Sequence, residues 1–116
     1  MSSIKVKLTK QVEIFGKRVA EIVMKEPTGG QYTRIGDPRT LVFSTTGSGY
    51  WVEDKTAIVA YYEALIEHDA GGEALVSLLN LRDAMRVKET LFSFFAQASE
   101  PQTVEGKSTI SASAQT

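Results

Sequence analysis

Alternation of apolar and polar residues near the start of this chain constrains its fold more than any other feature. A period of two residues is typical of a β-strand with one buried and one solvated face. Gly16 follows, where a two-residue turn needs the positive φ that glycine adopts at little cost, and VAEIVM then resumes the pattern. We therefore predict an antiparallel hairpin over residues 4–25. The alternating apolar residues are Ile4, Val6, Leu8, Val12 and Ile14.

The middle of the chain predicts a connection and a second hairpin. Two prolines and three glycines interrupt residues 25–40, which leaves room for one helical turn between Thr28 and Ile35. The segments TLVFS and YWVED then flank TTGSG. Because glycines at a hairpin tip accept positive φ, we expect a second, shorter hairpin over residues 40–54.

Three helices are predicted after this hairpin. Asp54 is a candidate N-cap for a helix over residues 55–68, whose apolar residues recur at helical spacing, and His68 stands where its charge would favour the helix end. A short helix is expected in EALVSLL, and Asn80 is a candidate N-cap for a helix over residues 81–98. We predict an α+β domain over residues 1–98, with one or two antiparallel hairpins packed on two or three helices.

Residues 99–116 are rich in Ser, Thr, Gln and Ala, with Val104 and Ile110 as the only large apolar residues. Such a segment buries too little surface to offset its ordering entropy. We expect this tail to be disordered.

Composition narrows the function classes. The chain has no cysteine, which removes disulfides, thiolate catalysis and cysteine zinc sites. Thirteen basic and fourteen acidic residues give a net charge of −1, and no apolar run is long enough to span a bilayer. With no signal-peptide core at the start, we expect a cytoplasmic protein that binds neither nucleic acid nor membrane.

No catalytic or cofactor motif is complete. EGKS, at residues 105–108, lacks the first glycine of a phosphate-binding loop, and TGGQYTRIG is spaced wrongly for a dinucleotide fingerprint. Glu63 and Glu67 lie one helical turn apart but are better explained as a solvated face. We expect no catalytic residue, no metal and no cofactor, and therefore no enzyme.

The helix over residues 81–98 carries more apolar surface than one small core needs. Its apolar residues spread over roughly 200° of its circumference, and Lys88 lies near the middle of this arc, where an ammonium needs a carboxylate or a route to water. Either the hairpins and the short helix cover the whole arc, or part of it binds a partner or another copy of the chain. The candidate partner-binding residues are Met85, Lys88, Leu91, Phe92, Phe94 and Phe95.

These residues carry a resemblance. A hairpin with a glycine-lysine turn, IFGKRVAEIVMKEP, followed after a variable middle by LNLRDAMRVKETLFSFF, resembles the tail assembly chaperones of long-tailed phages and prophages. The residues shared with that family are Glu26, Pro27, Asp83, Phe94 and Phe95, and the likeness covers residues 4–96. The hairpin predicted at residues 40–54 departs from the family, where mostly helical sequence is expected.

The resemblance implies a non-catalytic role in viral morphogenesis. Such proteins keep the long helical tape measure protein soluble in the host cytoplasm while tail tube subunits polymerise around it, and are absent from the mature virion. In many of them a ribosomal −1 frameshift adds an extension that recruits tube protein. Residues 105–107 (EGK) permit the slippery codons GAG GGA AAG. The alternative is a structural tail protein of the tail completion type, which stays in the virion.

Overall fold

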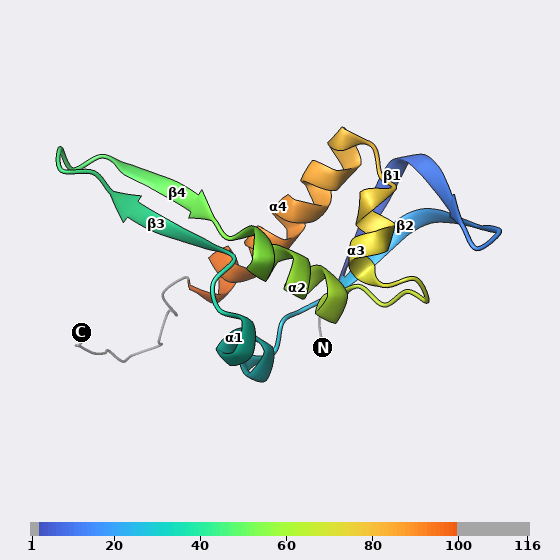
Figure 1. Ribbon diagram of the computed structural model, residues 1–116, viewed down its shortest axis with the longest axis horizontal. Helices are drawn as coiled ribbons and strands as arrows, with labels where there is room; N and C mark the ends of the chain where they lie inside the picture. The colour runs from blue at the N-terminus through green and yellow to red at the C-terminus, as the bar shows by residue number, and fades with distance from the viewer. Residues whose placement is uncertain (1–2, 100–116) are drawn as a thin grey trace, which may run out of the picture.

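The computed structural model describes residues 3–99 of the chain and shows the predicted α+β fold (Figure 1). Two separate two-stranded antiparallel sheets stand at opposite ends of the molecule, with helices between them. The predicted disordered tail lies outside the described residues from residue 100 onward. In chain order the elements are β1 (Ser3–Ile14), β2 (Lys17–Lys25), α1 (Gly29–Ile35), β3 (Arg39–Phe43), β4 (Gly49–Glu53), α2 (Lys55–Leu65), α3 (Gly72–Ser77) and α4 (Leu81–Ala98).

The first hairpin forms as the alternation predicts. Phe15 and Gly16 occupy its two-residue turn, both in the left-handed region, with φ values of 56° and 73°. Ile4 pairs with Met24, and Val6 pairs with Ile22, so that their side chains share the face that packs on the helices. The opposite face carries lysine and glutamate side chains and is solvated.

A large bulge interrupts β1 where three consecutive polar residues, Thr9, Lys10 and Gln11, break the alternation. The pairing passes from Lys7 opposite Glu21 to Val12 opposite Val19, so that four residues of β1 face a single residue of β2. Backbone groups in a bulge lose their ladder partners and need others. The bulge therefore turns the backbone N–H groups of residues 9 and 10 toward α4.

Asp83, in the first turn of α4, accepts hydrogen bonds from those N–H groups. Its carboxylate accepts hydrogen bonds from the Thr9 N–H at 3.0 Å, from the Thr9 hydroxyl at 3.1 Å and from the Lys10 N–H at 3.3 Å. Arg86 lies 3.4 Å from the same carboxylate and donates to the Lys7 carbonyl at 2.7 Å. Asp83 is fully buried, so this cluster anchors the start of the last helix to the first strand.

Caps begin α1 and α2 where the sequence predicts. Thr28 caps α1 in a capping box with Gln31, and the Asp54 carboxylate accepts from the Ala57 N–H at 3.1 Å. However, α2 ends at Leu65, three residues before the predicted end at His68. Ile66 adopts an extended conformation and bridges to Met24 of β2, so the predicted helix end at His68 is wrong.

The core lies between the first hairpin and the helices α2, α3 and α4. Gly72 starts α3 directly against the last turn of α2. Asn80 caps α4, as predicted, by accepting from the Asp83 N–H at 2.8 Å. The buried cluster comprises Val6, Ile22, Met24, Ile58, Tyr61, Tyr62, Leu65, Ile66, Leu75, Val87, Leu91, Phe92 and Phe94.

The second hairpin, β3 and β4, projects away from this core and is called the arm below (Figure 1). Its strands pair in register from Arg39 opposite Glu53 to Phe43 opposite Gly49. Every residue of β4 is exposed. The second hairpin predicted over residues 40–54 is therefore confirmed.

Candidate functional site

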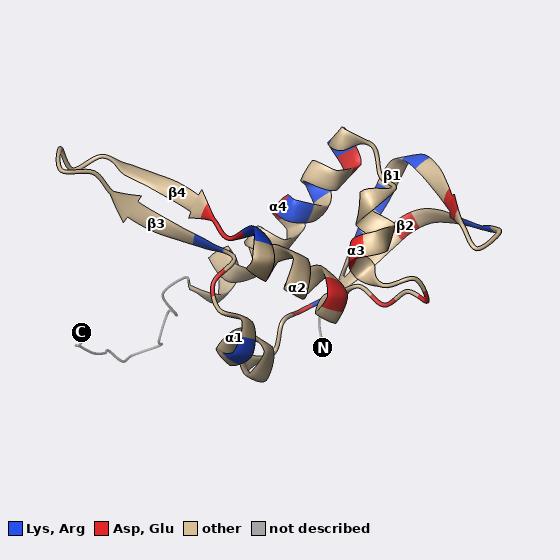
Figure 2. Ribbon diagram, viewed as in Figure 1, with Lys and Arg blue, Asp and Glu red and all other residues tan. Residues whose placement is uncertain are grey.

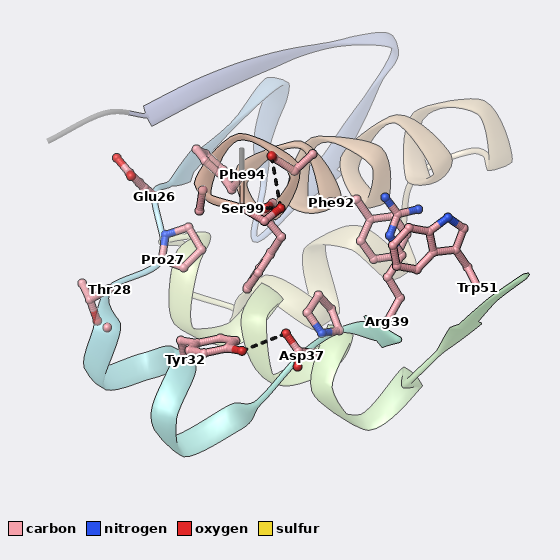
Figure 3. A pocket seen from close by; sticks show the side chains of 15 residues that line it. Glu26, Pro27, Thr28, Tyr32, Asp37, Arg39, Trp51, Phe92, Phe94 and Ser99 are labelled. Carbon is pink, nitrogen blue, oxygen red and sulfur yellow. Dashed lines mark hydrogen bonds between the residues drawn. The ribbon is translucent and has the colours of Figure 1, made fainter. Parts of the chain in front are cut away.

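A groove of about 650 Å³ opens between the linker before α1, the base of the arm and the last turns of α4 (Figure 3). Because its walls are mainly aromatic and apolar side chains, it is called the aromatic groove below. Its lining residues are Glu26, Pro27, Thr28, Gly29, Tyr32, Asp37, Pro38, Arg39, Trp51, Phe92, Phe94, Phe95, Ala96, Ala98 and Ser99.

Phe95 holds the helical side of the groove together. Its ring packs edge-on against Tyr61 of α2, with centroids 5.2 Å apart, and in a tilted arrangement against Tyr32 of α1 at 5.9 Å. Such aromatic pairs stabilise a fold beyond the area they bury. The Tyr61 hydroxyl donates to the Gly36 carbonyl at 2.6 Å, so the end of α1 is fixed to α2 at the same place.

Arg39 forms the opposite end of the groove. Its guanidinium lies between two rings, 4.2 Å from the centroid of Trp51 and 4.3 Å from that of Phe92 (Figure 3). Stacking on both faces leaves the N–H donors at the edge of the guanidinium plane. Within residues 3–99 this guanidinium makes no ion pair with a carboxylate. The edge therefore offers a planar, positively charged donor to an incoming group.

Asp37 supplies the acidic part of the groove wall. The Tyr32 hydroxyl donates to its carboxylate at 3.0 Å (Figure 3). This hydrogen bond, followed by the negative charge of Asp37, raises the pKa of Tyr32 above its ordinary value. Tyr32 is a neutral hydrogen-bond donor at physiological pH, and its bond to Asp37 ties α1 to the segment that follows it.

The six predicted partner-binding residues do not form one surface. Phe92, Phe94 and Phe95 all line the aromatic groove. Phe92 and Phe94 are nevertheless buried members of the core, and Phe95 is half-buried. Leu91 is wholly buried in the core and presents no surface to a partner in this structure.

Met85 and Lys88 lie elsewhere on α4. Met85 is 49% exposed and lies outside the groove. Lys88 finds the carboxylate that its place in the apolar arc demands, because its ammonium binds Glu53 of β4 at 3.1 Å. This ion pair joins the end of the arm to the middle of the helix. Most of the apolar arc of α4 is thus covered within the chain, and the larger exposed apolar surface lies on the arm.

Sequence reasoning missed Arg39, Trp51 and Tyr32, which complete the groove. Strand alternation in the predicted second hairpin contained a usable indication for two of them. In the observed register Leu41 faces Trp51, and Arg39 is the diagonal neighbour of Trp51 on the same face. The position of Tyr32 depends on how α1 docks, which local sequence does not specify.

The groove has the chemistry of a binding surface. Apolar walls with a few polar groups at the rim suit a partner that is itself amphipathic. Among residues 3–99, no group of three or more His, Cys, Asp or Glu side chains is placed to hold a metal ion. In the same part of the chain, no helix is long and apolar enough to cross a membrane.

The chain was also compared with known proteins. It matches no protein family model, no curated protein and no solved structure.

Proposed function

We propose that this protein is a phage tail assembly chaperone that binds the tape measure protein and keeps it soluble during tail tube assembly, without catalysis. The aromatic groove is the observation that carries this proposal. Its apolar walls include Phe94 and Phe95, near the end of the last helix. These paired phenylalanines are among the residues that carry the sequence resemblance.

The shape of the groove suits one face of an amphipathic helix. Its volume of about 650 Å³ accommodates a few large side chains, whereas the rest of a client helix would lie outside and keep its polar face in water. Aromatic walls bind apolar side chains of many shapes with similar affinity. A chaperone needs such broad binding when its client is long and varied in sequence. Contacts of this limited extent also allow the client to leave when tube subunits arrive.

Charge further defines the client segment. Arg39 presents guanidinium donors, which form no ion pair within residues 3–99, beside Trp51 and Phe92 at one end of the groove. A carboxylate is the group that a planar guanidinium binds best. We therefore expect the client helix to place an acidic residue next to its apolar stripe.

The remaining parts of the proposal come from the resemblance. The chaperone acts in the host cytoplasm and is absent from the mature virion. An elongated frameshift product would recruit the tail tube protein through an extension beyond residues 105–107, which lie outside the described residues. Sequencing the gene tests this part directly: other codons there, or a closed −1 frame downstream, would remove the frameshift.

The alternative is a structural tail protein retained in the virion. The exposed arm favours it, because a permanent subunit would cover that surface in the assembled particle. Mass spectrometry of purified particles separates the two functions. Stoichiometric amounts of this chain in mature particles would support the structural protein, and its absence supports the chaperone.

The main test is co-expression of the full chain with the long helical protein encoded next to it, followed by size-exclusion chromatography of the soluble fraction. The proposal predicts that an otherwise insoluble partner becomes soluble and co-elutes with the chain. A partner that stays insoluble beside freely soluble chain would contradict binding by this form.

Two matched variants locate the binding surface on α4. Phe95→Asp introduces a charge into the groove wall and should abolish co-elution, whereas Met85→Asp introduces the same charge on an exposed part of α4 outside the groove and should not. Tyr32→Ala widens the groove from α1, where the side chain is 44% exposed, and should weaken co-elution without a charge. Equal co-elution of all three would exclude the groove. Phe94 is unsuitable for this test because it is buried in the core.

A further inference from the structure

The arm exposes an apolar surface that nothing in residues 3–99 covers. No charged residue occurs between residues 40 and 52. Figure 2 shows the contrast within one molecule: charged positions recur along β1 and β2, whereas the arm carries charge only at its base, at Arg39 and Glu53. The exposed apolar side chains of the arm are Leu41 (43%), Phe43 (65%), Tyr50 (52%), Trp51 (53%) and Val52 (47%).

An arm of this kind is unfavourable in water by itself. A single two-stranded hairpin is at best marginally stable without a packing partner. Natural sheets also protect their edges with charges, prolines or covering segments, and the arm has none of these between residues 40 and 52. The first hairpin, by contrast, packs one face on the core and covers its other face with charge. The arm therefore requires a partner.

At alternate residues of β3, the backbone N–H and C=O groups point away from β4, toward the open edge of the sheet. Asp54 N–H donates to the Pro38 carbonyl, and Ser44 N–H donates to the Ser48 carbonyl, both at 2.8 Å. Bonded and non-bonded pairs alternate along an antiparallel ladder, so the odd-numbered residues between these two bonds point their backbone groups away from β4. Within residues 3–99, the β3 residues whose backbone N–H and C=O groups point away from β4 and make no hydrogen bond are Arg39, Leu41 and Phe43.

We propose that two copies of this chain pair edge to edge through β3, which forms a four-stranded antiparallel sheet across a two-fold axis. With the axis at Leu41, this residue faces its own copy, and Arg39 faces Phe43 of the partner. All three outward-facing residues of each strand then find hydrogen-bonding partners. No like charges meet in this register.

The side-chain surface agrees with a second copy as the occupant. Trp51 and Leu41 face each other on one side of the arm, so pairing would extend this row into Leu41 and Trp51 of the other copy. The exposed side chains of Leu41, Phe43 and Trp51 lie on one face of the arm, and those of Tyr50 and Val52 lie on the other. The arm lacks the charge that would select a charged partner.

The test measures the mass of the full chain alone, without any client, by size-exclusion chromatography with light scattering over a dilution series. We expect twice the chain mass of 12.7 kDa at high concentration. Leu41→Lys places two ammonium groups opposite each other in the dimer. Because like charges repel, the variant should raise the dimer dissociation constant by at least about tenfold. Val23→Lys, at an exposed site of the first hairpin, should leave it unchanged.

Hydrogen exchange provides a second measurement, which uses only the wild-type chain and therefore does not depend on whether a variant folds. The amides of residues 41 and 43 should gain protection as the concentration rises, whereas that of residue 15 in the first turn should not. A chain that has the single-chain mass at every concentration, or equal dissociation of Leu41→Lys and Val23→Lys, would overturn the proposal and assign the arm to a different partner. Because no client is present, either result is independent of the groove.

Discussion

Gly72 offers the sharpest test of how the helices pack. A methyl group at this position would overlap the carbonyl oxygen of Tyr62, and it would lie 2.6 Å from the carbon of that carbonyl and 3.1 Å from Cβ of Ile66. Real Cβ atoms do not approach backbone this closely. Because these backbone atoms belong to the end of α2, they cannot rotate away as a flexible side chain would. Gly72→Ala must therefore push α3 off α2.

The expected cost follows from this geometry. Overpacking a well-packed core costs about 1–3 kcal/mol, and a collision with rigid backbone belongs at the upper end of that range. For a domain of roughly 100 residues, each kcal/mol lowers the Tm by about 4–8 °C. We expect Gly72→Ala to lower the Tm by about 12–24 °C.

Gly30→Ala is the matched control. The same methyl group in α1 would meet only Oγ1 of Thr28, at 4.0 Å, so it should be neutral or stabilise the fold by up to about 1 kcal/mol. Thermal unfolding of both variants, followed by circular dichroism, measures the difference. A Tm for Gly72→Ala within a few degrees of the wild-type value would show that α3 does not lie against α2 as described.

Two further predictions concern titration. Burial alone would raise the pKa of Asp83, but the N–H groups of Thr9 and Lys10, the Thr9 hydroxyl and the charge of Arg86 together lower it below its ordinary value of 3.8. The charged carboxylate therefore stabilises the fold above about pH 4, and this stabilisation is lost as the pH falls further. Asp83→Asn should lower the free energy of unfolding at neutral pH. It should also reduce the fall in the urea midpoint that the wild-type protein shows below about pH 4. Burial, with a smaller effect of Glu53, raises the pKa of Tyr62 to about 12. The free energy of unfolding should therefore fall between about pH 10 and 12, because Tyr62 ionises first in the unfolded chain. Tyr62→Phe should remove that loss. If Tyr62 in the folded protein titrates near pH 10, as an ordinary tyrosine does, the result would argue against its burial.

Local patterns in the sequence predicted most elements of the fold. Both hairpins, the turn at Gly16 and the caps at Asp54 and Asn80 rest on interactions between residues close in the chain. The early end of α2 could not be foreseen, because Ile66 leaves the helix to pair with Met24, a residue more than forty positions away. The bulge in β1 escaped prediction for the same reason, since its partner is Asp83.

The site was predicted only in part. Helical spacing correctly marked the last helix as apolar over much of its surface, and Lys88 as a residue in need of a carboxylate. It could not reveal that Leu91 faces inward while Phe95 borders a groove, because this distinction depends on where α1 and the arm dock. Arg39 and Trp51 belong to the site only through that docking.

The bond between Thr9 and Asp83 joins residues 74 positions apart, and this separation sets the order in which the chain folds on the ribosome. At synthesis rates of roughly 5–20 residues per second, the first hairpin, which ends at Lys25, is made about 3–12 s before the aspartate that anchors its bulge. During that interval α4 is not yet available to complete the core around Val6, Ile22 and Met24. The lysines and glutamates on the other face of this hairpin then keep the nascent strands soluble, which is a second use for charges that the finished fold does not bury.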